Sequence, residues 1–270
     1  MNHIVYNRLP VKHAYNVREL GGFACAGANV TSWKTFLRAD DLANLDDEDM
    51  RLLTQYGVSL IIDLRSDEEC CASPNPFANH DIVGYVNIPL MENVIANVSE
   101  EMQRNPQAFL GSFYVNLLHE AAVPICKVFD AMSAQQNGAV LFHCAAGKDR
   151  TGVIAALLLG LAGVCRADIV ANYETTYTFI RENPTYSGQA QDYAADLLMS
   201  KSENIEKMLA HIDEKYKGAC AYLQSERVGL SDESINTIRK RFCQSASPLA
   251  DMGRAAMPCL FECVAGNSNR

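Results

Sequence analysis

One short loop combines a nucleophile with an anion-binding group. Residues 143–150 read His-Cys-Ala-Ala-Gly-Lys-Asp-Arg, and Thr151 and Gly152 follow them. Cys144 and Arg150 are separated by five residues. A cysteine thiolate is a strong nucleophile, and the planar guanidinium of arginine can bind two oxygens of a phosphate group at once. This pair of residue types at this spacing predicts phosphate transfer through a covalent cysteine intermediate.

The segments on either side indicate where this loop lies in the fold. Residues 138–142 form a short apolar run typical of a buried strand, and residues 153–159 form an apolar run typical of a helix. The loop therefore joins the carboxyl end of a strand to the N-terminus of a helix. Free backbone N–H groups and the positive end of the helix dipole meet there, so they can bind phosphate and favour a thiolate. The expected phosphate-binding residues are Ala145, Ala146, Gly147, Lys148, Asp149 and Arg150.

The loop resembles the signature of the cysteine-dependent phosphatases. Its form, His-Cys-x-x-Gly-Lys-Asp-Arg-Thr-Gly, is similar in particular to that of the bacterial and fungal tyrosine-specific and lipid (dual-specificity) phosphatases. Residues 16–22 resemble that family's Asn-x-Arg-Asp-Leu-Gly-Gly segment, and residues 61–66 resemble its Asp-Leu-Arg motif. The resemblance covers roughly residues 13 to 243. Two departures lie outside the loop: Glu19 replaces an aspartate, and Ala39 replaces a serine.

The resemblance implies a reaction that needs no metal and no cofactor. The Cys144 thiolate attacks phosphorus, while Arg150 and the loop N–H groups stabilise charge on the remaining phosphate oxygens. Thr151 is expected either to donate its hydroxyl to the cysteine sulfur or only to cap the following helix. His143 is expected to hold the loop through backbone contacts rather than to transfer protons.

The leaving oxygen needs a proton, and two carboxylates are candidates for supplying it. The mobile Trp-Pro-Asp loop of other tyrosine phosphatases is missing, because the only tryptophan of the chain precedes a lysine. The resemblance favours Asp149 as the general acid, although this carboxylate could instead position Arg18 or Lys148. Asp63, at a predicted strand end, is the rival. Its alternative role is an ion pair with Arg65 or Arg18 that holds the edge of the sheet.

Three other interpretations of the loop are weaker. A nucleotide-binding Gly-x4-Gly-Lys-Ser/Thr loop would need glycine at Phe142 and a hydroxyl side chain at Asp149. Sulfur transfer of the rhodanese type also uses a cysteine loop, but the Thr-Gly pair after the arginine favours phosphate chemistry. A catalytically silent phosphate-binding module remains an alternative, against which the intact Cys144 and Arg150 count.

The substrate is less determined than the reaction. Protein phosphotyrosine is the first choice, and inositol phosphates or phosphoinositides are the second. Lys148 adds a positive charge beside Arg150, as in loops that act on phosphoinositides. Ala145, however, stands where dedicated inositol-lipid phosphatases have a second lysine.

Composition excludes several other classes of protein. The chain has 270 residues, a net charge of -9 and 49% hydrophobic residues, which argues against broad nucleic-acid binding or a polybasic membrane patch. Its longest apolar run, residues 153–164, is too short to cross a bilayer, and no secretory signal is visible at the N-terminus. The ten cysteines show no metal-ligand spacing. Because thiolate chemistry needs a reducing compartment, we expect a cytoplasmic protein, with secretion lacking a recognisable signal left open.

Alternating elements predict an α/β fold of the cysteine-phosphatase type, with a mostly parallel central sheet flanked by helices. The expected strands are residues 34–39, 58–64, 83–89 and 138–142, and the expected helices before the loop are residues 46–56 and 121–136. Residues 93–118 have helical spacing and form either a lid over the site or a packing helix. We expect residues 1–243 to form the phosphatase domain and residues 244–270 to form a tail with little structure.

Overall fold

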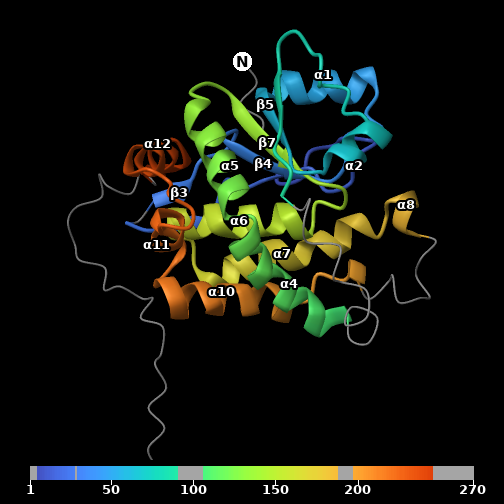
Figure 1. Cartoon of the computed structure of the whole chain (residues 1–270). Helices are drawn as coiled ribbons and strands as arrows, with labels where there is room; N and C mark the ends of the chain where they lie inside the picture. Colours follow the sequence, from blue (N-terminus) through green and yellow to red (C-terminus); the bar gives the residue numbers. More distant parts are fainter. Residues whose placement is uncertain (1–4, 28, 91–105, 188–196, 246–270) are drawn as a thin grey trace, which may run out of the picture.

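The computed structural model describes residues 5–27, 29–90, 106–187 and 197–245. A five-stranded sheet forms its centre, in the order β1-β4-β7-β5-β6 (Figure 1). These strands are β1 (Arg18–Glu19), β4 (Phe36–Ala39), β5 (Val58–Asp63), β6 (Gly84–Asn87) and β7 (Ala139–His143). All neighbours pair in parallel except β1, which is antiparallel to β4. The predicted mostly parallel α/β sheet is confirmed.

Both faces of the sheet are buried, and alternate residues of each strand enter different cores. One core contains Phe36, Ile62, Val140 and Phe142, and the other contains Leu37, Ile61, Ala139 and Leu141. This alternation follows from the period of two along a strand. Burial on both faces explains the continuous apolar runs of β5 and β7, residues 60–62 and 139–142, which do not alternate with polar residues.

Helices cover the two faces unequally. Helix α1 (Asp47–Tyr56) packs on the smaller core, and α2 (Asp67–Ala72) follows β5. The larger core lies on the opposite face, where α5 and α6 cross the sheet (Figure 1). The helices contributing to this larger core are α4 (Pro106–Glu120), α5 (Ala122–Ala134), α6 (Asp149–Ala162), α7 (Arg166–Ile180), α10 (Ser202–Tyr216), α11 (Ala219–Gln224) and α12 (Asp232–Phe242). The short α8 (Pro184–Ser187) follows α7.

The predicted helical insertion includes α4, which is a packing helix. Its side chains at Leu110, Tyr114, Leu117 and Leu118 are buried, and it lies along α10. A helix with this many side chains buried in the core stays packed, so α4 does not open as a lid. The earlier part of the predicted insertion, residues 93–105, lies outside the described residues.

The predicted start of the C-terminal tail is wrong by two residues. Gln244 and Ser245 continue from Cys243 as strand β8 (Cys243–Ser245), which pairs with β3 (Asn29–Thr31). Together with β2 (Ala24–Cys25) these strands form a second, three-stranded sheet. Backbone pairing with a distant strand orders these polar residues, and no local sequence pattern shows that pairing. The remainder of the predicted tail, residues 246–270, lies outside the described residues.

Among the described residues, no single helix combines the length and the apolarity that crossing a membrane requires. The helical segments 109–120 and 122–134 are long and apolar enough only when they are counted together. They are bent by 74° relative to each other.

Glu19 places a carboxylate inside the molecule, at the start of the sheet. Its side chain is 1% exposed, and Oε1 accepts hydrogen bonds from the Tyr56 hydroxyl (2.6 Å) and the Lys34 backbone N–H (2.8 Å). Oε2 has no hydrogen-bond partner among the described residues. Burial raises the pKa of Glu19 from 4.5 to about 6, because these two hydrogen bonds offset the lost hydration only in part.

The raised pKa of Glu19 predicts that the free energy of unfolding depends on pH. The folded state holds the Glu19 proton more tightly than the unfolded chain, so stability from this group is present below the unfolded pKa and is lost as pH rises through about 6. Glu19→Gln should remove this dependence. Denaturant unfolding should show the variant gaining about 2 kcal/mol relative to the wild type between about pH 4 and about pH 7. The exposed Glu226→Gln should show no such change, and equal behaviour of the two variants would contradict the prediction.

Candidate active site

The predicted loop begins where three strands end side by side. In the sheet register His143 lies beside both Ala39 and Asp63, the last residues of their strands. Cys144 follows directly and is 2% exposed. Helix α6 begins at Asp149, four residues before the apolar run that predicted it, so Arg150 belongs to its first turn. The loop therefore lies at the carboxyl edge of a parallel sheet, where α/β proteins bind ligands.

The loop's backbone carbonyls are held from outside the loop. Three consecutive residues are involved, and each carbonyl accepts at least one hydrogen bond. The contacts are Asp41 N–H to the Ala145 oxygen (2.9 Å), Asn16 Nδ2 to the oxygens of Ala146 (3.3 Å) and Gly147 (3.1 Å), and Arg38 Nη2 to the Gly147 oxygen (2.6 Å). A trans peptide points its C=O and N–H in opposite directions, so this anchoring leaves the N–H groups free for an anion on the inner side.

A buried network fixes the two side chains that do this anchoring. Arg18 Nη1 donates to Asn16 Oδ1, and Arg18 Nη2 donates to the Asn172 carbonyl (2.8 Å) and to Thr176 Oγ1 (3.0 Å). Arg38 Nη1 donates to Asn172 Oδ1 (2.8 Å). Burial lowers the pKa of Arg38 to about 10, which still leaves it charged at neutral pH. Arg18 thus lies behind the loop as a supporting residue.

Asn16, Arg38 and Asn172 are functional positions that sequence reasoning did not assign. Asn16 belongs to residues 16–22, which are similar to the family, and Arg38 directly precedes Ala39, where the family has a serine; that similarity is the available signal. Asn172 has no signal of this kind, because only the packing of α7 brings it to Arg38.

Arg150 is oriented by a carboxylate on α2. Its Nη1 and Nη2 donate to Glu69 Oε2 (2.5 Å) and Oε1 (2.8 Å). Glu69 also accepts from the Ser66 N–H while Ser66 accepts from the Glu69 N–H, which is a capping box. Although burial raises the pKa of Glu69, the Arg150 hydrogen bond and charge outweigh it, and the net direction is down. Glu69 is therefore an ionised positioning group whose role the sequence did not reveal.

His143 and Asp63 form a second buried support. The His143 Nδ1 lies 3.3 Å from the Cys144 carbonyl oxygen, and its Nε2 lies 2.9 Å from Asn75 Nδ2. Asp63 lies 3.4 Å from His143 and binds Arg65 at 2.7 Å. Burial acts to raise the pKa of Asp63, but the hydrogen bonds and charges of His143 and Arg65 hold it well below its usual range. The predicted ion pair of Asp63 is with Arg65, not Arg18, and a fully buried, strongly ionised carboxylate is a poor proton donor.

Asp149 is the carboxylate that remains accessible at the loop. Its side chain is 29% exposed, and Oδ1 accepts a hydrogen bond from the Tyr114 hydroxyl (2.5 Å). The Tyr114 and Tyr173 hydroxyls are 2.6 Å apart. Burial first, and then the charge of Asp149, raise the pKa of Tyr114 well above its usual value, so this hydroxyl stays protonated and able to donate. Tyr114, from α4, is a site residue that was seen in the sequence only as part of a helix.

The predicted role of the Lys148 side chain as a substrate-binding charge stays a prediction. This side chain is 2% exposed, its ammonium donates to the Leu197 carbonyl, and Nζ lies 3.4 Å from Asp149 Oδ1. The ammonium is therefore held by the Leu197 carbonyl and by Asp149. Sequence spacing could not show this, because the Leu197 carbonyl comes from a distant segment.

Thr151 does not cap the helix. Its hydroxyl oxygen is fully buried and has no hydrogen-bond partner among the described residues. Donation of this hydroxyl to the cysteine sulfur stays a prediction. The N-terminus of α6 also lacks a side-chain cap from its N-cap residue, Lys148, which is the usual condition of a helix end that binds an anion.

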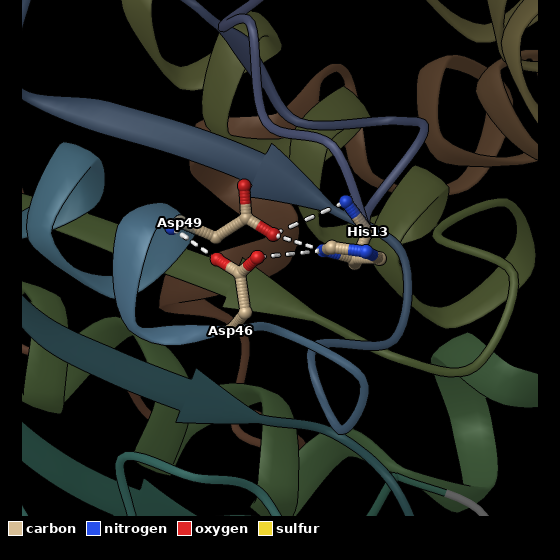
Figure 2. Close-up of side chains that lie close together, drawn as sticks. All are labelled: His13, Asp46 and Asp49. Carbon is tan, nitrogen blue, oxygen red and sulfur yellow. Dashed lines mark hydrogen bonds and ion pairs between the residues drawn. The ribbon is translucent and has the colours of Figure 1, made fainter.

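A separate cluster of possible metal ligands lies at the start of α1. One ligand atom each from His13, Asp46 and Asp49 falls within 4.8 Å of the others (Figure 2). Each carboxylate already has a structural partner. Asp46 caps α1 through the N–H groups of Glu48 and Asp49, and Asp49 accepts from the His13 N–H (3.2 Å) and Nδ1 (2.7 Å). These contacts fasten the N-terminal segment to α1.

Two comparisons with known proteins, a family model and a sequence relative, identify the family of this chain. The model of a family described as the tyrosine phosphatase family matches residues 9–244. A tyrosine-protein phosphatase of Nostoc commune is 36% identical over 222 residues, which is 78% of this chain and 74% of that protein. Two crystal structures of P. aeruginosa TpbA, one of them a variant in complex with phosphotyrosine, are 15% and 16% identical, each with a TM-score of 0.31. They cover 61% and 66% of this chain, and 91% and 95% of their own chains are covered.

Gly147 allows the loop to pass close to β4. Its φ is +64°, and a Cβ there would lie 2.4 Å from the Ala39 carbonyl oxygen. Gly147→Ala should therefore displace the loop and abolish phosphate binding. The matched control is Gly229→Ala, because Gly229 has a φ of +75° with nothing within 4 Å of a Cβ. Unfolding should show Gly147→Ala to be the less stable variant by about 1–3 kcal/mol, the usual cost of overpacking. Equal losses in the two variants would show that the contact with Ala39 relaxes freely.

Proposed function

The chain belongs to the tyrosine phosphatase family, and from that premise we propose that it hydrolyses phosphotyrosine in proteins through a cysteinyl-phosphate intermediate, without a metal ion. The observation that carries the proposal is the anchoring of the loop carbonyls by Asn16, Arg38 and Asp41 around Cys144. This anchoring supports a ring of backbone N–H donors, with the nucleophile at its base. Glu69 and α6 add an oriented Arg150 to that ring.

In the first proposed step the Cys144 thiolate attacks phosphorus and forms the S–P bond. The P–O bond to the tyrosine oxygen breaks, and that oxygen takes a proton from Asp149. Arg150 and the loop N–H groups stabilise the equatorial oxygens, whose charge is largest in the transition state. The geometry favours Asp149 over Asp63 for this role, because Asp149 is accessible while Asp63 is enclosed by His143 and Arg65.

In the second step water attacks phosphorus and the S–P bond breaks. Asp149, now a carboxylate, takes a proton from the water, and the Thr151 hydroxyl donates a hydrogen bond to the departing sulfur. The unpartnered, buried hydroxyl of Thr151 supports this role. Orthophosphate leaves, and the thiolate is regenerated.

The alternatives lose support in the structure. A phosphoinositide phosphatase was suggested by the Lys148 charge, which is engaged by the Leu197 carbonyl and by Asp149. A catalytically silent phosphate-binding module would not need an ordered Glu69–Arg150 pair or an accessible carboxylate at Asp149.

Replacement of the nucleophile tests the proposal. Cys144→Ser should lower the turnover of p-nitrophenyl phosphate by at least about 10³-fold, or about 4 kcal/mol in barrier, because a serine hydroxyl is not ionised there. The variant should still bind a phosphotyrosine peptide in calorimetry. Cys126→Ser, on α5, is the control and should keep full activity. A Cys144→Ser enzyme within about tenfold of the wild type would rule out covalent cysteine catalysis.

The identity of the general acid can be tested by the leaving group. Asp149→Asn should reduce kcat for phosphotyrosine by about 10²-fold or more and should affect an ester with an acidic leaving group much less, since such a group leaves without a proton. It should also flatten the alkaline limb of the pH profile. Asp63→Asn is the comparison and should reduce turnover of both esters alike. The reverse pattern would assign the proton to Asp63.

A further inference from the structure

Two histidines from different helices bring the same ring nitrogen together. His119, near the end of α4, and His211, on α10, place their Nε2 atoms 3.1 Å apart. The rings are perpendicular, with an interplanar angle of 90° and centroids 5.1 Å apart, so they do not stack. Helices α4 and α10 lie side by side, on the opposite side of the molecule from α1 (Figure 1). The pair is therefore separate from the cluster of possible ligands at the start of α1.

The short distance between the two nitrogens leaves room for a single proton. If one Nε2 donates, the other must accept, and two protonated rings would direct their N–H groups at each other. Two neutral rings can instead turn both lone pairs toward one metal ion. For a tetrahedral Zn²⁺ with Zn–N bonds of about 2.0–2.1 Å, two imidazole nitrogens lie about 3.3 Å apart. The observed separation of 3.1 Å differs from that value by only about 0.2 Å.

The surrounding fold restricts both rings. Tyr216 packs against the His211 ring at a centroid distance of 6.3 Å, and Tyr216 in turn packs on the buried ring of Tyr222 at 5.1 Å. The carbonyl of His119 accepts a hydrogen bond from Arg227 Nη1 (3.1 Å). Both histidines are half-buried. A metal ion would therefore meet side chains that the fold has already placed, which lowers the entropic cost of binding.

A pocket of about 370 Å³ between α4 and α10 gives access to the pair, and His211 and Glu214 line it together. These two residues are three apart on one helix, so their side chains lie on the same face. Glu214 is exposed, and in the described part of the chain its carboxylate enters no hydrogen bond or ion pair, since Lys217 binds only its backbone carbonyl (3.0 Å). This carboxylate can turn toward the Nε2 atoms as a third ligand, and the pocket has room for a water molecule as the fourth.

Charged groups of both signs surround the pair. The positive ones are Lys207, Lys215 and Arg227, and the negative ones are Glu120 and Glu214. This mixture disfavours Mg²⁺ and Ca²⁺, which depend on several oxygen ligands. Imidazole nitrogens instead suit Zn²⁺ and its neighbours among the transition metals. A metal ion bound here must gain its affinity from the two imidazoles.

We infer that His119, His211 and Glu214 form a binding site for a divalent transition-metal ion of the Zn²⁺ type, separate from the catalytic loop. The metal ion replaces the proton between the two Nε2 atoms and clamps α4 to α10. It takes no part in the proposed reaction, so the inference goes beyond the proposed function and does not depend on it. The clamp bears on the active site only through α4, which also carries Tyr114, the partner of Asp149.

The first experiment titrates Zn²⁺ into the full chain by calorimetry, with a phosphine in place of a thiol reductant. Cysteine thiolates also bind Zn²⁺, but they are the same in every variant, so the difference between variants reports the histidines. His119→Gln and His211→Gln should each weaken one Zn²⁺ site by at least about tenfold, the effect of a lost ligand. His13→Gln, which changes the cluster at α1, is the control. Unchanged affinity in both pair variants, or a loss only in His13→Gln, would overturn the inference.

The second experiment tests the carboxylate ligand. Glu214→Gln should weaken the same Zn²⁺ site by about tenfold, the effect of one charged contact. The control is Glu206→Gln, which removes an equal charge from α10 but does not line the pocket. Its Zn²⁺ affinity should match that of the wild type. Equal affinities of the two variants would overturn the three-residue site.

The third experiment measures unfolding with and without Zn²⁺. A metal ion that binds only the folded chain raises the folded-to-unfolded ratio about 100-fold when its free concentration is about 100 times Kd. This rise should appear in the wild type and in His13→Gln and should be lost in His211→Gln. Because each variant is compared with itself, a change in its intrinsic stability does not affect the result. A His211→Gln chain that Zn²⁺ stabilises as strongly as the wild type would contradict the inference.

Discussion

The structure depends on a loop whose backbone carbonyls are bound from outside the loop. Carbonyls that are withdrawn from water need a hydrogen-bond donor, and a tight loop cannot supply one from its own backbone. Asn16 and Arg38, in the N-terminal part of the chain, donate hydrogen bonds to the carbonyls of Ala146 and Gly147. Residues more than 100 positions away therefore set the geometry of the loop. Helix α6 begins at the end of this loop.

This arrangement explains why so many charged groups are buried near the site. Arg18 and Arg38 are 2% and 0% exposed, and neither has a carboxylate at salt-bridge distance among the described residues. Their partners are neutral oxygens, including those of Asn172 on α7. These neutral acceptors bind the Nη groups of both guanidiniums without cancelling their charge. The positive charge behind the loop is therefore not cancelled by a neighbouring carboxylate.

The same logic separates the carboxylates by role. Glu69 and Asp63 are held ionised by Arg150 and by Arg65, and they position cations and backbone. Asp149 accepts a hydrogen bond from the Tyr114 hydroxyl, lies 3.4 Å from the Lys148 ammonium and stays in contact with solvent. Glu69 and Asp63 thus support arginine side chains, whereas Asp149 is bound by a phenol and an ammonium.

The sequence by itself determined the parallel sheet, the place of the loop between β7 and α6, and the motif from Cys144 to Arg150 that this loop carries. These features are local, because apolar periodicity and a contiguous motif are written in neighbouring residues. Tertiary structure alone decided that Lys148 faces Leu197, that Glu69 and Tyr114 orient Arg150 and Asp149, and that Ser245 belongs to a sheet. Each of these depends on a contact between segments far apart in the chain, and side-chain direction across such contacts is fixed by packing rather than by spacing.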